Sequence, residues 1–133
     1  MVLVDTTVWI DLLRGRETVG ALRLRDLLSK GSAAVAPVIV QELVQGASSA
    51  PNAEALRSHF LALPLLSSPD VAGAHARAGI LYARCRWHGL APRSPHDCLI
   101  AQAALDHDVS LLHNDRDFEL IAEVEPRLTL IRD

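Results

Sequence analysis

Four acidic residues from separate parts of the chain stand beside segments that the sequence predicts to be strands or helices: Asp5, Glu42, Asp97 and Asp115. Carboxylates from several elements can together hold Mg²⁺, which prefers oxygen ligands and keeps several of its waters. Two such ions, about 3.5–4 Å apart, lower the pKa of a water and stabilise the leaving oxygen of a phosphodiester. Without metal, the same carboxylates would repel one another and raise each other's pKa. The pattern therefore predicts phosphodiester hydrolysis that depends on a divalent cation.

Two of these acids follow predicted strands. Asp5 comes directly after the apolar run 2–4, and Asp115 comes shortly after the predicted strand 110–112. Ligands of a parallel sheet bind outside the carboxyl ends of its strands, so we expect both acids to lie in one crevice. Asp5 also has a structural explanation, because it can cap the helix that follows it. Asp117 can cap the next short helix, which leaves Asp115 free for a site.

Asp97 is the third residue of a helix that Ser94 and Pro95 are expected to open. An acid at that position interacts well with the helix dipole, which would be a purely structural role. At 100° per residue, however, Asp97 shares a helix face with three small or apolar residues: Ile100, Ala101 and Ala104. A carboxylate on such an inward face needs a hydrogen-bond donor or a metal, and this favours a role in the site.

Glu42 lies within the predicted helix 37–46, at the edge of its apolar stripe. A glutamate in that position is most often a solvated surface residue. Glu42 alone is therefore a weak indication, and its assignment rests on the other three acids. Together the four supply acids at two strand ends and on two flanking helices, as a metal site requires.

The composition indicates one globular domain spanning residues 1–133. Half of the 133 residues are hydrophobic and 22% are charged, which provides a core and argues against disorder. No apolar run approaches the roughly 20 residues of a membrane span, and the start lacks the basic leader of a signal peptide. Cys85 and Cys98 have no metal-ligand spacing, so we expect reduced thiols and a cytoplasmic location. Because the net charge is −3, a nucleic acid would have to be held locally, by carboxylates whose bound cations reverse the sign of the site.

Strand and helix patterns alternate along the chain. The predicted strands are 2–4, 34–36, 65–66, 110–112 and 128–131. The predicted helices are 8–14, 22–31, 37–46, 53–63, 70–88, one from 94 that ends near 106–108, and a short one from 117. Such alternation implies right-handed crossovers, so we expect an α/β protein of three α/β/α layers with a mostly parallel central sheet.

A group of arginines flanks the loop that follows the predicted helix 70–88: Arg84, Arg86 and Arg93. These side chains could grip RNA phosphates, with Trp87 stacking on a base. The alternative is a solvated helix end with Trp87 in the core.

Four segments, in this order, resemble PIN-domain ribonucleases and, more narrowly, VapC-type toxins of bacterial toxin–antitoxin pairs. They are Val4-Asp5-Thr6-Thr7-Val8-Trp9-Ile10, Val40-Gln41-Glu42-Leu43, His96-Asp97-Cys98-Leu99-Ile100-Ala101 and Leu111-Leu112-His113-Asn114-Asp115-Arg116-Asp117-Phe118. The resemblance covers essentially the whole chain. It implies a doubly wound α/β/α fold, RNA cleavage with Mg²⁺ or Mn²⁺, and an acidic quartet made of the four acids above.

The resemblance also implies supporting residues and partners. Thr7 would support Asp5, Asp117 would be an auxiliary acid, and Asn114 joins this supporting group. His113 stands where relatives usually carry threonine or serine, which calls the support of Asp115 into question. The partners implied are an RNA substrate (transfer, ribosomal or messenger), a small VapB-type antitoxin and a second copy of the chain.

Two other functions fit parts of the pattern. A PIN-like scaffold without activity would keep the fold, and a metal titration would distinguish it. A phosphatase would use Asp5 as nucleophile, but the segment Asp5-Thr6-Thr7 has no adjacent acid and the only lysine, Lys30, is poorly placed.

Overall fold

The computed structural model describes residues 1–131, and within them four strands form a single parallel sheet. The strands are β1 (Val2–Val4), β2 (Ala33–Ala34), β3 (Ser110–Leu112) and β4 (Leu130–Ile131), in the order β2-β1-β3-β4. β1 pairs in parallel with both β2 and β3, so that Val4 lies opposite Leu112. β3 pairs in parallel with β4. The predicted α/β fold with a parallel sheet is confirmed.

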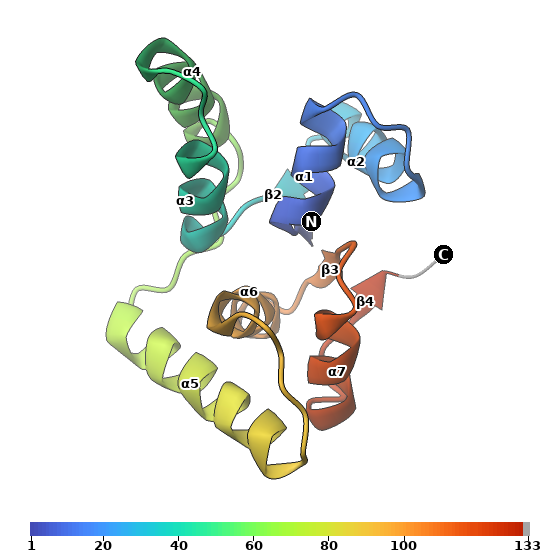
Figure 1. Ribbon diagram of the computed structural model, residues 1–133, viewed down its shortest axis with the longest axis vertical. Helices are drawn as coiled ribbons and strands as arrows, with labels where there is room; N and C mark the ends of the chain where they lie inside the picture. The colour runs from blue at the N-terminus through green and yellow to red at the C-terminus, as the bar shows by residue number, and fades with distance from the viewer. Residues whose placement is uncertain (132–133) are drawn as a thin grey trace.

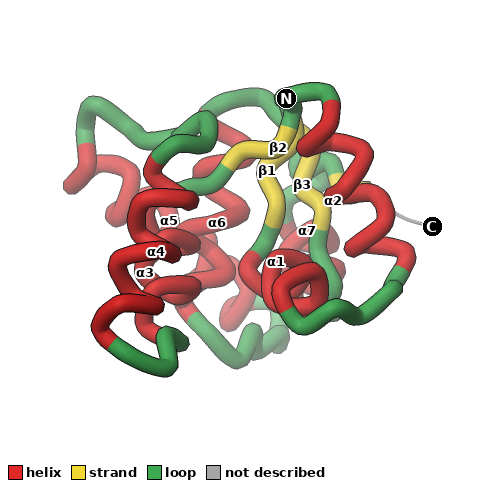
Figure 2. Tube along the Cα trace, turned by 90° about the horizontal axis from the view of Figure 1, so that it is seen from above, coloured by secondary structure: helices red, strands yellow, loops and turns green. Residues whose placement is uncertain are grey.

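Seven helices surround this sheet within the described residues, and their bounds follow the predicted order. They are α1 (Thr6–Leu13), α2 (Val19–Ser29), α3 (Pro37–Gln45), α4 (Ala50–Leu61), α5 (Val71–Trp87), α6 (Pro95–Asp106) and α7 (Asp117–Val124). Figure 1 shows α1 and α2 on one side of the strands and α5, α6 and α7 on the other, with α3 and α4 side by side as a projecting arm. Seen from above, the short strands run between these groups of helices (Figure 2).

The central strands are apolar because they are covered on both faces. Leu3 and Val4 of β1 and Leu111 of β3 have no exposed surface. This is the burial expected of parallel strands with helices above and below. Trp9 packs edge to face on Phe60, with ring centroids 5.1 Å apart, and donates its indole N–H to the Val4 carbonyl over 3.1 Å. That contact connects α1 to the arm and to the end of β1.

One predicted strand, at 65–66, is wrong. That segment pairs in parallel with β2's neighbour Val35 through an isolated bridge to Leu65. The pairing consists of the Val35 N–H bonded to the Pro64 carbonyl and the Leu66 N–H bonded to the Val35 carbonyl. It cannot extend, because Pro64 has no N–H to donate and Ala36 already caps α3.

Several element boundaries also differ from prediction. α1 begins at Thr6 rather than at residue 8, since Asp5 caps it, and the strand expected at 34–36 is shifted to Ala33–Ala34 because α3 begins at Pro37. Among the described residues, no helix has the length and apolar character needed to cross a bilayer. Cys85 and Cys98 are both buried as free thiols.

Candidate metal centre

Asp5 lies at the carboxyl end of β1 and is both a helix cap and a member of the acidic group. Its Oδ2 accepts the backbone N–H of Thr7 over 3.2 Å and the hydroxyl of Thr7 over 2.5 Å. The residue is buried, and the charge of Glu42 acts on its carboxylate. The two interpretations of Asp5 are therefore compatible, because capping orients the carboxylate without removing it from the site.

Asp97 points into the protein from the first turn of α6. It is 8% exposed, and the three residues that share its face are also buried: Ile100, Ala101 and Ala104. The neighbouring charges that act most strongly on Asp97 are all negative, and none of the hydrogen bonds among the described residues reaches its carboxylate. The inward orientation predicted from helix periodicity is confirmed, and the carboxylate is left without a donor.

The carboxylates of α6 and of the β3–α7 loop come together. Asp97, Asp115 and Asp117 each offer an oxygen within 4.8 Å of the others, a spacing that one cation could bridge. The charges of Asp5 and Glu42 also act on Asp97. The structure thus brings Asp97, Asp115 and Asp117 together, and it places Asp5 and Glu42 near enough for their charges to act on Asp97.

Two of these carboxylates, those of Asp5 and Asp97, have raised pKa values. Burial raises the pKa of Asp5 to about 6, against the lowering effect of its Thr7 hydrogen bonds. Burial, followed by the charges of the four other acids, raises the pKa of Asp97 to about 7. Near neutral pH the Asp97 carboxyl therefore keeps its proton more readily than an ordinary aspartate when no cation is bound. A divalent cation bound to these carboxylates would favour their ionised forms and so oppose both shifts.

Glu42 is held toward the centre and is not a freely solvated residue. Its Oε1 accepts the hydroxyl of Thr6 over 2.8 Å, and its Oε2 lies 3.8 Å from Nδ1 of His96. Its side chain is 23% exposed. This role of Thr6 was not predicted from the sequence. The available indication was the pair of adjacent hydroxyls after Asp5.

The division of roles predicted for Asp115 and Asp117 is wrong. The backbone N–H of Asp117 donates to Oδ1 of Asp115 over 2.9 Å, so Asp115 caps α7. Asp117 is itself the first residue of α7. The free N–H at this helix start is its own, so its side chain does not cap the helix. It is buried, and its carboxylate binds Arg93 instead.

His113 takes over the support of Asp115 for which relatives are expected to use a hydroxyl. Its Nδ1 accepts the backbone N–H of Asp115 over 3.1 Å. The ring stacks at a tilt on Phe118, with centroids 5.2 Å apart, and its Nε2 lies 3.7 Å from Glu119. The unusual residue thus positions the loop through a ring nitrogen.

Asn114 links the β3–α7 loop to α1. Its side-chain amide donates to Asp11 over 2.9 Å, and its backbone N–H donates to the Thr7 hydroxyl over 3.2 Å. Asp11 is buried and also pairs with Arg16 at 3.2 Å. Sequence reasoning missed Asp11, although it is the single charged residue in the apolar helix Thr6–Leu13. Thr7 therefore contacts both Asp5 and the loop that carries Asp115.

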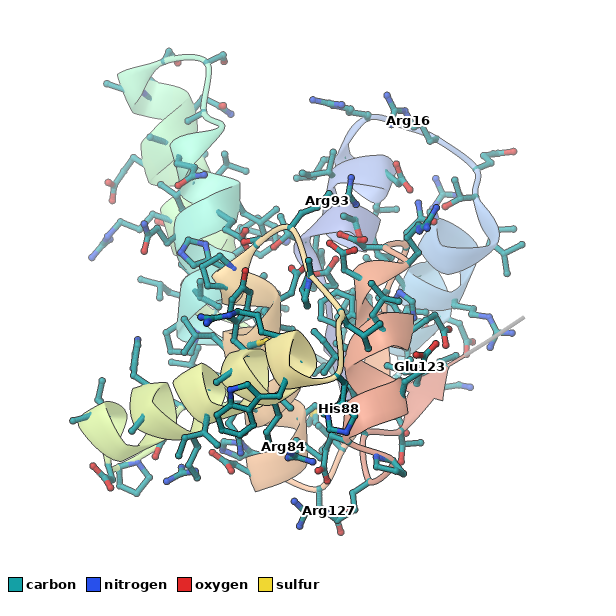
Figure 3. The ribbon with its side chains drawn as sticks, turned by 60° about the horizontal axis from the view of Figure 1, so that its bottom comes forward. Arg16, Arg84, His88, Arg93, Glu123 and Arg127 are labelled. Carbon is teal, nitrogen blue, oxygen red and sulfur yellow. The ribbon has the colours of Figure 1, made fainter. Side chains whose placement is uncertain are left out.

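The three predicted RNA-binding arginines lie in different places. Arg93 contacts the acidic group, whereas Arg84 donates to Glu125 over 3.1 Å and to the Val124 carbonyl over 2.8 Å. Figure 3 shows Arg93 well apart from Arg84, which lies near His88 and Arg127. Arg86 is exposed near the end of α5.

Trp87, the last residue of α5, does not belong to the core. It is 72% exposed, the largest exposed fraction among the big apolar side chains of the described residues. The interpretation of Trp87 as a core residue is wrong, because Trp87 lies about 200° around the helix from the buried Cys85 and so faces away from the core.

Comparison with known proteins places this arrangement in a family. The family model described as PIN domain matches residues 2–124. VapC ribonuclease Mb1587 of Mycobacterium bovis and Ribonuclease VapC11 of Mycobacterium tuberculosis are each 35% identical to the chain over 126 residues, which is 93% of both sequences.

Solved structures agree on the fold. VapBC2 from Rickettsia felis, bound to a promoter DNA fragment, contains a chain that matches with a TM-score of 0.73 at 20% identity, over 98% of both chains. DNA-bound VapBC from Salmonella typhimurium matches with a TM-score of 0.72 at 22% identity, over 98% of this chain and 96% of that one.

Proposed function

The chain belongs to the PIN domain family, within its VapC-type ribonuclease toxins, and on that premise we propose that it cleaves RNA at the acidic centre. The catalytic residues proposed are the four acids Asp5, Glu42, Asp97 and Asp115. The observation that carries this assignment is Asp97, a buried carboxylate with four acidic neighbours and no donor among the described residues. A buried charge of this kind is stable only when a cation or a proton compensates it.

The donor set fits a hard divalent cation. All the candidate ligands are carboxylate oxygens, which Mg²⁺ and Mn²⁺ prefer, and histidine and cysteine do not take part. We propose that Asp5, Asp97 and Asp115 hold one cation, and that Glu42 completes this site or a second one. The spacing of the Asp97 and Asp115 oxygens supports this proposal.

The chemistry proposed is direct hydrolysis of the phosphodiester, without a covalent enzyme intermediate. A bound divalent cation supplies an activated water and stabilises charge on the phosphate oxygens. The chain's own groups orient the acids: Thr7 holds Asp5, Thr6 holds Glu42, and His113 positions the backbone of Asp115. Asp5 is 3% exposed and hydrogen-bonded to Thr7, which disfavours the alternative of a phosphatase with Asp5 as nucleophile.

We further propose the surroundings in which the nuclease acts. The substrate is a transfer, ribosomal or messenger RNA, and the partners are a VapB-type antitoxin and a second copy of the chain. The similarity to chains of VapBC complexes supports the antitoxin. The two buried free thiols suit the reducing cytoplasm.

RNA contacts outside the centre are proposed for Arg86 and Trp87. The exposed indole of Trp87 offers a face for base stacking, and the neighbouring guanidinium of Arg86 is free to approach phosphates from the same helix end. For Arg84 the same role has less support, because its guanidinium already binds Glu125 and a carbonyl.

The test is cleavage of total RNA with mapped 5′ and 3′ ends, in Mg²⁺ or Mn²⁺ and in chelator. We expect discrete cleavage that the chelator abolishes and that Asp97→Asn loses, while circular dichroism shows an intact fold. Gln102→Ala, a change on the same helix outside the acidic group, serves as the control and keeps activity. Cleavage by Asp97→Asn at the wild-type rate contradicts the site, and metal binding without any RNA cleavage favours the inactive scaffold.

A further inference from the structure

Arg93 places a positive charge directly on the acidic centre. It lies in the loop between α5 and α6, and it reaches Asp115 of the β3–α7 loop and Asp117, the first residue of α7. Its backbone N–H and its Nε both donate to Oδ2 of Asp117, over 3.0 and 3.1 Å. Its Nη2 donates to Oδ1 of Asp115 over 3.1 Å. These are two of the three carboxylates whose oxygens lie within 4.8 Å of one another.

The two contacts of the guanidinium differ in how easily they can break. Asp117 is buried, and it receives both a backbone and a side-chain donor from Arg93. Removing those donors would leave an uncompensated buried charge, which is costly. Asp115 is more exposed and receives a single bond from Arg93, whose side chain is 75% exposed. The Asp117 contact is therefore the anchor, and the Asp115 contact is the one that solvent can replace.

Arg93 contacts Asp117 and lowers its pKa, whereas Asp97 has no described contact with Arg93. Burial would raise the pKa of Asp117, but the hydrogen bonds and charge of Arg93 outweigh it and the pKa is lowered. Asp97 receives no such contact, and its pKa is raised. Arg93 thus places its single positive charge against Asp115 and Asp117, and none of its described contacts reaches Asp97 on α6.

A divalent cation bound to Asp115 would lie beside this guanidinium, and the two positive charges would repel each other. We propose that Arg93 is an internal counter-ion of the metal-free centre, whose Nη2 leaves Asp115 when the cation binds and then contacts an RNA phosphate. This inference rests on the proposed function, because it concerns the same cation and substrate. The backbone N–H and Nε stay on Asp117, so the freed end of the guanidinium remains at the entrance to the centre.

Metal binding provides the first test. Mn²⁺ is titrated by calorimetry into the wild-type chain, Arg93→Gln and Arg116→Gln, each checked for its fold by circular dichroism. Arg116 is the matched control, since it is exposed and its charge acts on Asp117 without a hydrogen bond to it among the described contacts. We expect Arg93→Gln to bind Mn²⁺ roughly three- to tenfold more tightly than wild type, and more tightly than Arg116→Gln. Equal or weaker binding by Arg93→Gln overturns the inference.

Steady-state cleavage of one RNA provides the second test. Arg93→Gln should raise KM roughly three- to tenfold with kcat within about twofold, because the lost phosphate contact is made in the ground state and the transition state alike. Arg93→Lys, which keeps the charge, should recover part of the loss. A KM equal to that of wild type contradicts the phosphate contact. Absence of Mn²⁺ binding by the wild-type chain would instead refute the proposed metal-dependent function, so the two failures are distinguishable.

Discussion

The hydroxyl of Thr6 donates to the carboxylate of Glu42 over 2.8 Å, across 36 positions of sequence. The next residue, Thr7, donates its hydroxyl to Asp5. Two adjacent threonines at the start of α1 therefore hold two of the proposed catalytic acids, one from their own strand end and one from α3. This explains how a glutamate on the edge of a helix, with a partly exposed side chain, is oriented toward the centre.

Removing the Thr6 hydroxyl should release Glu42. Hydrogen bonds to charged groups contribute about 1.5–3 kcal/mol, so we expect Thr6→Val to lower kcat for RNA cleavage by roughly tenfold. Thr6→Ser keeps a hydroxyl at the same place and should retain most of the activity. The measurement is initial rates on a defined RNA at saturating Mg²⁺. Equal rates for Thr6→Val and wild type would show that Glu42 needs no such support.

The stability of the metal-free protein should fall as pH rises from about 4 to about 7. Burial and mutual repulsion raise the pKa of Asp5 to about 6 and that of Asp97 to about 7, from the ordinary aspartate value of 3.8. The folded state therefore binds more protons than the unfolded state in this window, and folding loses stability as those protons leave. The measurement is urea unfolding at several pH values in chelator.

A matched variant and added metal test whether these two carboxylates cause the fall of stability with pH. Asp97→Asn removes one of the two groups, so its free energy of unfolding should depend less on pH between about 5 and 7. Mg²⁺ should flatten the wild-type curve, because the cation stabilises the ionised carboxylates. Acids whose pKa is lowered, such as Asp106 and Asp117, act below this window and in the opposite direction. A wild-type stability that rises from pH 5 to 7 in chelator would contradict the assignment.

Arg84 should prove to be a structural residue. Its guanidinium ties α5 to the end of α7 through Glu125 and the Val124 carbonyl, and the Glu125 side chain is 5% exposed. Losing these bonds leaves a buried carboxylate less well compensated, so we expect Arg84→Gln to lower the free energy of unfolding by about 1–3 kcal/mol. Mn²⁺ affinity should stay unchanged. A variant with wild-type stability but weaker RNA binding would instead restore Arg84 to the RNA-binding group.

Trp87 should show the opposite behaviour. Because its side chain is mostly exposed, Trp87→Ala removes little buried surface and should leave the denaturation midpoint nearly unchanged. Loss of base stacking should raise KM for RNA by roughly five- to a hundredfold, equivalent to about 1–3 kcal/mol. Ile80→Ala is the control, since Ile80 is also exposed on α5 and offers no ring. An unchanged KM for Trp87→Ala excludes the indole from RNA binding.

The local features of the chain could be predicted from the sequence. Apolar runs followed by caps indicated β1 and β3, and Pro37 and Pro95 marked the starts of α3 and α6. Periodicity alone showed that Asp97 faces inward. These features depend on interactions within a few residues, so a short stretch of sequence is enough to determine them.

The contacts within the centre could not be predicted in the same way. Nothing near Glu42 in the sequence indicates Thr6, and nothing near Asp117 indicates Arg93, since the partners come from other elements. The roles of Asp115 and Asp117 have the same origin, because Arg93, from another element, binds the Asp117 carboxylate while Asp115 accepts the N–H of Asp117.

The sequence by itself thus determined which elements form and which acids stand at their ends, because hydrophobic periodicity and capping are local properties. Only the tertiary structure decided which side chain holds each acid, that Trp87 remains in solvent, and that the guanidinium of Arg93 lies against Asp115 and Asp117. Those outcomes depend on how α3, α6 and the two loops pack around the ends of β1 and β3, where burial converts neighbouring charges into strong interactions.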